Sequence, residues 1–348
     1  MTVHTVRVAE PDTPTLGADR VATPVRRRGW LPFAVLAALA GAAVLSATVG
    51  STPVALEALW QGDHPDHGIA AARLDRTALG AAVGAALALA GALLQGLTRN
   101  PVADPGLLGI NSGASLAVVV SISVLGVSTT VGYVWAALLG AAAAGLLVHT
   151  VAAVGPGGAT PVKIAVSGAA VTAAVTSLTS ALLLMDRAAM TSFRFWSVGT
   201  FGGRDWSVLS AGLPFLAVGV VLAFAGARLL DALALGDDVA RGLGARVRRD
   251  RAVVGLAAVL LAGTATALAG PIAFVGLVVP HVVRAYTGPR HGVLLLWSAL
   301  VGAVLVLLAD TVGRVIAPPS EVQVGVMAAL VGLPFFLVLV RRIRGGGL

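Results

Sequence analysis

Apolar residues follow one another along this chain in long, nearly unbroken runs, and polar residues gather between the runs. A helix needs about 20 apolar residues to cross the hydrocarbon core of a bilayer, and runs of about that length occur ten times. They lie at about 31–50, 77–97, 106–126, 131–154, 163–185, 206–229, 252–269, 271–287, 292–312 and 323–340. The strands of a membrane barrel would alternate polar and apolar positions. The pattern therefore predicts an all-α polytopic membrane protein with ten transmembrane helices.

The seventh and eighth runs form one nearly continuous apolar stretch over residues 252–287. A single helix of that length would measure ~54 Å, against a hydrocarbon core of ~30 Å. Pro271 cannot continue a helix, and it disfavours helical backbone at Gly270. We therefore expect two short spans joined by a tight turn at the outer surface near Gly270 and Pro271. One long kinked helix is the alternative.

The composition supports a membrane protein that is not an enzyme. Hydrophobic residues make up 57% of the 348 residues and charged residues 11%, where soluble proteins have about 25% charged residues. The chain has no cysteine, which excludes disulfides, thiolate metal sites and thiol catalysis. Its six histidines are scattered, and no phosphate-binding loop or pair of catalytic carboxylates is visible. We expect this chain to bind no cofactor.

The net charge of +8 comes almost entirely from arginine, with Lys163 as the only lysine. Basic loops orient membrane helices, because Lys and Arg stay on the cytoplasmic side. If both termini are cytoplasmic, most of the 24 basic residues lie in inner loops. We therefore read the charge as a signal of orientation and not of nucleic-acid binding. Residues 1–29 are polar and are predicted to form a disordered tail before a membrane domain at 30–348.

One inner loop, residues 230–251, predicts a short amphipathic helix with Asp237 as its N-cap and Asp238 as a first-turn acid, followed by a basic cluster. Its apolar face and closing turn comprise Val239, Ala240, Gly242, Leu243 and Gly244. The helix could dock into the groove of a partner, or the loop could be solvated with its arginines only fixing the topology. The residues alone favour neither.

Other loops are read mainly as structural. The prolines, Asn and Asp of residues 99–106 predict a structured turn, and the small residues at 109–115 predict close helix packing. Residues 155–161 predict a flexible, irregular turn, and the aromatic residues of 186–205 suggest an interfacial helix or rim. Both segments could also act as gates. Asp310 and Arg314 are spaced to pair across one helical turn. His281 is expected to make a structural hydrogen bond rather than to relay protons.

Four segments resemble the FecCD permeases, the membrane subunits of ABC importers for iron–siderophore complexes, haem and vitamin B12. The segments are R-L-D-R-T-A-L-G at the start of 73–116, A-G-P-I-A-F-V-G-L-V-V-P-H at 269–281, L-A-D-T-V-G-R at 308–314 and E-V-Q-V-G-V-M-A-A-L-V-G-L-P-F-F at 321–336. They occur in the family's order, and the resemblance extends from about residue 31 to the C-terminus.

The resemblance implies a type II ABC importer permease fold in the cell membrane, with ten spans and both termini cytoplasmic. It implies a second permease subunit, either a copy or a paralogue, and two ATPase subunits that hold ATP and Mg²⁺. A substrate-binding lipoprotein would dock outside and deliver a ferric siderophore, with cobalamin or haem as the alternative cargo. The rival class is an ATP-independent secondary carrier, which would show buried acids and no coupling helix.

The resemblance also assigns roles to residues. It matches the loop with the family's ATPase-coupling helix, and the matched residues are Asp237, Asp238, Val239, Ala240, Arg241, Leu243 and Gly244. Arg73, Arg76 and Arg314 match arginines that meet glutamates of the binding protein. Asp75 departs from the usual proline and would put a negative charge between Arg73 and Arg76. Candidates for the pathway or gate are Thr160, Pro161, Thr172, Thr176 and Ser180, for which ordinary backbone hydrogen bonding is the equal alternative.

Overall fold

The computed structural model describes residues 29–156, 158–244 and 246–345, and the secondary structure of these residues is entirely helical. The predicted tail lies outside the described residues, except for Gly29. The helices are α1 (Leu31–Thr48), η1 (Leu56–Leu59), α2 (His67–Thr98), η2 (Pro105–Leu108), α3 (Ile110–Ser123), α4 (Thr130–Ala153), α5 (Pro161–Met185), α6 (Arg187–Ser197), α7 (Trp206–Ala225), α8 (Ala227–Ala234), α9 (Asp237–Gly242), α10 (Val247–Ala269), α11 (Val275–Thr287), α12 (His291–Ile316) and α13 (Val324–Gly345).

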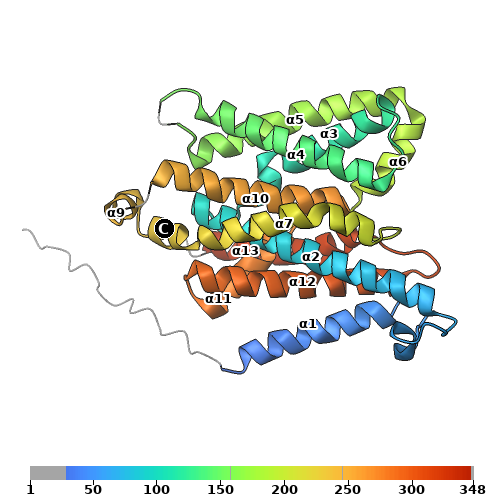
Figure 1. Cartoon of the computed structure of the whole chain (residues 1–348). Helices are drawn as coiled ribbons and strands as arrows, with labels where there is room; N and C mark the ends of the chain where they lie inside the picture. Colours follow the sequence, from blue (N-terminus) through green and yellow to red (C-terminus); the bar gives the residue numbers. More distant parts are fainter. Residues whose placement is uncertain (1–28, 157, 245, 346–348) are drawn as a thin grey trace, which may run out of the picture.

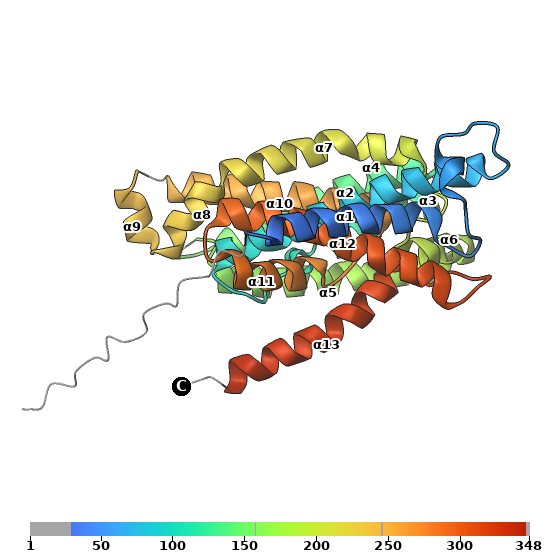
Figure 2. The same ribbon diagram turned by 90° about the horizontal axis from the view of Figure 1, so that it is seen from below.

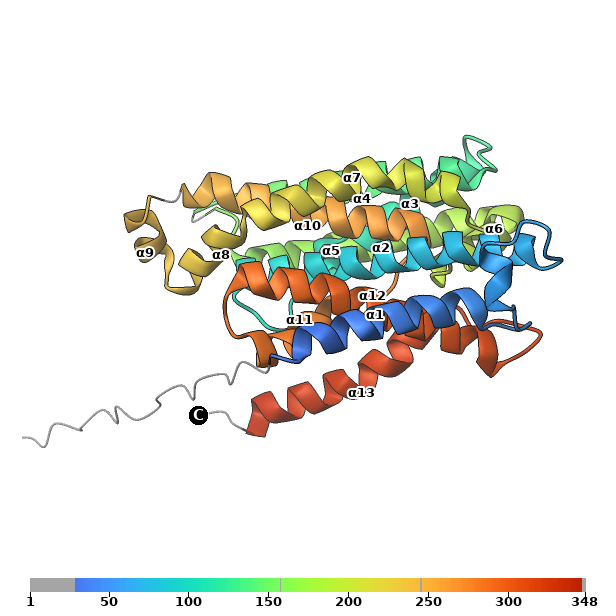
Figure 3. The ribbon, with the colours of Figure 1, turned by 60° about the horizontal axis from the view of Figure 1, so that its bottom comes forward.

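The long helices lie side by side in one bundle (Figure 1). The short helix α9 projects at one end, here called the α9 end, and α6 lies at the opposite end, here called the α6 end (Figures 1 and 3). The start of α1 and the end of α13 both lie toward the α9 end. Figure 2 shows that α13 diverges from the bundle over most of its length.

Each predicted apolar run contains a helix, but the helices differ in length. Within the described residues, seven are long and apolar enough to cross a membrane: α1, α2, α4, α5, α7, α10 and α12. The helices α3 and α11 have 14 and 13 residues, and the apolar part of α13 is Val324–Val338. The all-helical membrane fold is confirmed, and a count of ten spans stays a prediction.

Small residues let the central helices of the bundle approach closely. Helix α2 packs against α12, α10 and α11, and residues 86–95 of α2 are all buried. A methyl group added at Gly91 would lie 1.9 Å from the carbonyl oxygen of Gly276, and one added at Gly84 would lie 2.4 Å from that of Gly302. A methyl group at either glycine would force α2 away from its neighbours, because the clashing atoms belong to the backbone.

The predicted break between the seventh and eighth runs is confirmed. Helix α10 ends at Ala269, and Gly270 and Phe274 adopt positive φ angles of 80° and 68° before α11 begins. The turn is partly covered, because Pro271 is half-buried and Ala273 exposed, whereas Ala269 at the end of α10 is fully buried. The backbone N–H of Thr200 donates to the carbonyl of Ala269 at 2.8 Å. The start of α13 packs on the loop that carries Thr200, with the backbone N–H of Gly325 donating to the carbonyl of Gly199 at 3.1 Å.

Arg204 also covers the C-terminal end of α10. Its guanidinium donates to the carbonyl of Leu268 in the last turn of the helix, where carbonyl groups lack partners within the helix. The side chain is buried, and this burial lowers the pKa of Arg204 to about 10. A positive charge near a helix C-terminus is favourable to the helix dipole. Arg204 therefore acts as a cap on α10 and not as a free surface cation.

The aromatic residues near α6 divide between core and surface. Asp186 caps α6 by accepting hydrogen bonds from the N–H groups of Ala188 and Ala189. Trp196 and Phe201 are buried and join the main core, whereas Phe195 is 66% exposed. The predicted amphipathic helix is present, but an aromatic rim that includes Trp196 and Phe201 is wrong.

Candidate functional site

The predicted inner helix exists as α9, but its acidic residues do not cap it. Gly236 occupies the N-cap position with a φ of 115°, and no side chain caps the helix. Asp237 and Asp238 both lie in the first turn, where negative charge favours the helix dipole. The prediction that Asp237 serves as an N-cap is therefore wrong, and its carboxylate is available for other partners.

The apolar residues of α9 point in two directions. Ala240 is completely buried, whereas Val239 is 45% exposed and Leu243 is 68% exposed. Gly244 has a φ of 86° and ends the element. Two apolar side chains thus remain on the surface of a helix that projects from the bundle (Figure 3).

Asp237 joins α9 to two of the central helices. Its Oδ1 atom accepts a hydrogen bond from Arg99, at the C-cap of α2, and another from Arg251, in α10, at 2.8 Å. These three residues are called the α9 ion triplet below. Burial alone would raise the pKa of Asp237, but Arg251 and Arg99 outweigh that effect and the pKa is lowered. Asp238 instead pairs with Arg241 within α9 at 2.6 Å.

At the α6 end, Arg76 holds two carboxylates from distant parts of the chain. Its Nε and Nη2 atoms bind both oxygens of Asp310, at 2.9 and 2.8 Å, and its Nη1 donates to Glu321 at 2.8 Å. The side chain of Asp310 is 2% exposed and that of Glu321 is 37% exposed. A bidentate arginine–carboxylate pair of this kind fixes geometry as well as charge.

Two further arginines attach the end of α1 to this group. Arg314 is 2% exposed, lies 3.3 Å from Asp310 and donates to the carbonyl of Ser46 at 2.9 Å. Arg73 donates to the carbonyls of Thr48 and Thr52 at 2.8 and 2.5 Å. The predicted Asp310–Arg314 pair is confirmed. The residues Arg73, Arg76, Asp310, Arg314 and Glu321 are called the arginine cluster below.

The docking role assigned to Arg73, Arg76 and Arg314 stays a prediction, but these side chains already have partners within the chain. All three are largely buried and hydrogen-bonded within the chain. Asp75 accepts a hydrogen bond from the backbone N–H of Trp206 at 3.2 Å, and so its carboxylate also contacts the start of α7. The sequence analysis did not predict that Glu321 binds Arg76. The only indication in the sequence is that an acidic residue stands just before the last apolar run.

The pathway candidates on α5 fall into two groups. Thr160 caps the helix by accepting from the backbone N–H of Lys163 at 3.3 Å, and Pro161 begins the helix. Thr172 is half-buried, and Thr176 and Ser180 are exposed on α5. The cap gives Thr160 a structural function, while Thr176 and Ser180 stay candidates for contact with a partner or cargo.

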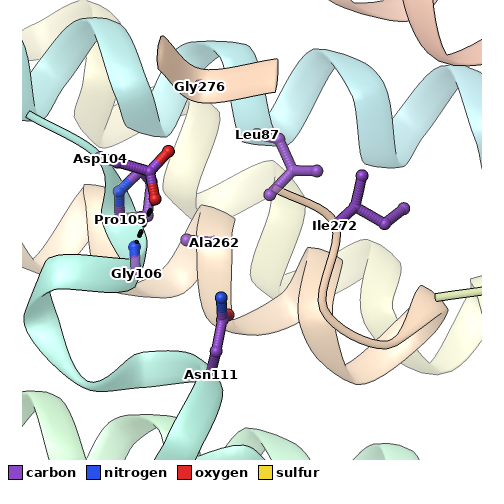
Figure 4. Close-up of a pocket in the computed structure, with 8 residues that line it drawn as sticks. All are labelled: Leu87, Asp104, Pro105, Gly106, Asn111, Ala262, Ile272 and Gly276. Atoms are coloured by element: carbon purple, nitrogen blue, oxygen red, sulfur yellow. Dashed lines mark hydrogen bonds between the residues drawn. The ribbon is translucent and has the colours of Figure 1, made fainter. Parts of the chain in front are cut away.

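A small polar cavity lies where the α2–α3 turn meets the start of α11 (Figure 4). Asp104 accepts a hydrogen bond from Gly106 at 2.8 Å, and Asn111 accepts one from Thr266 at 2.9 Å. Burial raises the pKa of Asp104, and the hydrogen bond from Gly106 offsets only part of this. The cavity has room for about one water molecule. It is a polar junction between helices and not a site for a large cargo.

Fold and charge distribution together define a class of protein. The chain is a multi-pass membrane protein with a short helix projecting at one end of its bundle and a buried charge cluster at the other. Among the described residues, no group of three or more His, Asp or Glu side chains could hold a metal ion. The fold is therefore that of an all-helical, multi-pass membrane protein.

Comparison with known proteins identifies the family. Residues 36–342 match the FecCD transport family, and the chain belongs to it. The Fe(3+)-citrate import system permease protein YfmD of Bacillus subtilis is 41% identical over 286 residues, which cover 82% of this chain and 85% of that protein. The Fe(3+) dicitrate transport system permease protein FecD of Escherichia coli is 40% identical, covering 88% and 96% of the two chains.

Other similar proteins are named for a different cargo or come from a solved structure. The cobalamin import system permease protein BtuC of Halobacterium salinarum is 40% identical and covers 77% of this chain and 72% of that protein. A solved metal-chelate type ABC transporter in an inward-facing conformation superposes with a TM-score of 0.79 at 28% identity, covering 89% of this chain and 98% of the other. The chain is therefore a permease subunit of an ABC importer.

Proposed function

We propose that this permease carries an iron(III)–siderophore complex across the cell membrane, driven by ATP hydrolysis on partner subunits. The observation that carries the proposal is its identity of about 40% to permeases named for ferric citrate, over more than four fifths of the chain. Cobalamin is the second candidate cargo, because a cobalamin permease is 40% identical. Family membership argues against an ATP-independent carrier.

In this proposal the α9 end faces the cytoplasm. The basic residues that follow α9, including Arg246, Arg248 and Arg249, are exposed at that end, as the positive-inside rule requires. The working assembly contains this chain, a second permease subunit, two ATPase subunits with their ATP and Mg²⁺, and an external binding protein. This chain itself binds no cofactor.

Helix α9 is the proposed contact with the ATPase, because it presents Val239 and Leu243 to a partner. Leu243→Asp places a charge on that surface and is expected to reduce copurification of the ATPase subunit. Leu56→Asp is the matched control, since Leu56 is 49% exposed at the opposite end of the bundle. Equal copurification by both variants would remove α9 as the dock.

The proposed contact with the binding protein uses Arg76. Its exposed side is occupied by Glu321, so an acidic residue of the binding protein would have to replace that carboxylate. Glu321→Gln removes the internal competitor and is expected to tighten association at low salt, where exposed charges are least screened. Unchanged association would show that Arg76 takes no part in docking. Charge reversal of Arg314 is a poor test, because it would place a second acid beside buried Asp310.

Transport by the reconstituted importer tests the cargo. Proteoliposomes that contain the permease, its ATPase and its binding protein are expected to accumulate a ferric siderophore only when ATP is hydrolysed. Cobalamin offered in the same vesicles distinguishes the second candidate. Accumulation without ATP would contradict the proposed mechanism, and accumulation of cobalamin alone would reassign the cargo.

A further inference from the structure

Helix α9 packs on the preceding helix α8 and touches α10, and beyond these contacts one carboxylate attaches it to the bundle. The helix has six residues, follows Gly236 at a φ of 115° and ends next to Gly244 at a φ of 86°. Its one buried residue is Ala240, whose methyl group buries little apolar area. Flexible glycines at both ends and a single small anchor do not fix the orientation of a helix.

The two arginines that bind Asp237 belong to the ends of two central helices, α2 and α10. Arg99 follows α2 directly, and the side chain of Gln95, one turn earlier, donates to the carbonyls of Gly276 and Leu277 at 3.2 Å each. Arg251 lies in the first turns of α10, which ends at the covered break described above. Asp237 thus connects α9 to α2, α10 and, through Gln95, the start of α11.

We infer that Asp237 is a positioning residue that ties the ATPase-coupling helix α9 to α2 and α10, so that movement of α9 is transmitted to the central helices. This inference rests on the proposed function of α9. Asp237 does not contact the ATPase in it, because its carboxylate is directed at Arg99 and Arg251. Loss of the carboxylate should leave the docking surface of Val239 and Leu243 present but loosely held.

The matched control is Asp250. It is an acid in the first turn of α10 at the same end of the bundle, and among the described residues its side chain has no hydrogen bond or ion pair. Asp237→Asn and Asp250→Asn each remove one negative charge from this surface. A difference between them therefore reports the ion triplet and not the net charge.

Two measurements test the inference. In the purified full-length permease, a spin label on Leu243→Cys, in a chain without native cysteine, is expected to become more mobile with Asp237→Asn and to stay unchanged with Asp250→Asn. In the assembled importer, Asp237→Asn is expected to lower the cargo transported per ATP by about tenfold, within the usual range of coupling between sites. ATPase copurification should persist.

A double-mutant cycle sharpens the result. Arg99→Gln is expected to reproduce part of the loss, and to add little in the Asp237→Asn background, because the two residues share one interaction. Equal label mobility and equal transport per ATP in Asp237→Asn and Asp250→Asn would overturn the inference. If Leu243→Asp and Leu56→Asp recover the ATPase subunit equally, the proposed docking function of α9 fails instead, and the label measurement still decides whether Asp237 holds the helix.

Discussion

The arginine cluster at the α6 end and the α9 ion triplet at the other end use the same chemistry in opposite settings. In the cluster, Asp310 and Arg314 are each 2% exposed. In the triplet, Arg99 and Asp237 are 44% and 30% exposed. Buried ions are costly unless each is paired, whereas exposed pairs contribute little stability. The comparison indicates that the cluster maintains the fold and that the triplet sets the orientation of α9.

The largest expected effect is the loss of Asp310. Asp310→Asn would leave two arginines, Arg76 and Arg314, with a buried positive charge and no adjacent buried acid. We expect destabilisation of ~3–5 kcal/mol, the usual result of breaking a buried pair from one side. Thermal unfolding in detergent measures it, with Asp250→Asn as the control. A variant as stable as the control would mean that the cluster is solvated, and the comparison would fail.

The arginine cluster shows which contacts can be predicted from the sequence and which cannot. Continuous hydrophobic runs predict helices, and the four-residue spacing predicts the Asp310–Arg314 pair, because both depend on contacts close in the chain. The partners of Arg76 lie 234 and 245 residues away. No local pattern could bring Asp310 and Glu321 to that arginine, so the sequence offers only the docking role that the family resemblance implies for it.

The break before Pro271 shows the same difference between local signals and contacts that form between distant segments. Proline and glycine predict where a helix stops, and α10 does stop at Ala269. They do not predict which residues cover the end of the helix. Here Thr200 binds the last carbonyl of α10, and the start of α13 binds the loop that carries Thr200. An impermeant thiol reagent should therefore leave a cysteine at Ala269 unlabelled from either side of the membrane.

An intermediate effect is expected for Arg73, which belongs to the cluster but has no bound carboxylate. Arg73→Ala removes two hydrogen bonds to the carbonyls of Thr48 and Thr52. Charged hydrogen bonds contribute about 1.5–3 kcal/mol, so we expect a loss of that size in unfolding free energy. Arg187→Ala, at an exposed position of α6, is the control. A loss as small as the control would show that Arg73 does not secure the end of α1.

A smaller effect is expected for Glu321, the most exposed member of the cluster. Glu321→Gln leaves the bidentate Arg76–Asp310 pair intact, so the change in unfolding free energy should be about 0–1 kcal/mol. Comparison with Asp310→Asn in the same thermal assay separates the buried pair from the exposed one. Destabilisation as large as that of Asp310→Asn would mean that the loop before α13 depends on this contact.

The smallest effects concern pH, and two acids outside the membrane spans should respond with opposite signs. The pKa of Asp104 is raised by burial, so ionisation costs stability, and that cost disappears as the pH falls through the raised pKa. Asp104→Asn keeps an acceptor for Gly106 and should therefore be at least as stable as the unmodified chain at pH 8.

The pKa of Asp237 is lowered, since Arg251 and Arg99 outweigh its burial. Its favourable contribution is therefore complete above the ordinary aspartate pKa and disappears only as the pH falls below that value. At pH 8 Asp237→Asn should be less stable than the unmodified chain by about 1 kcal/mol or less, because its pairs are half-exposed. Unfolding midpoints of both variants across the acidic range measure the two trends. If both variants differ from the unmodified chain in the same direction at pH 8, the opposite pKa shifts of Asp104 and Asp237 do not determine their contributions to stability.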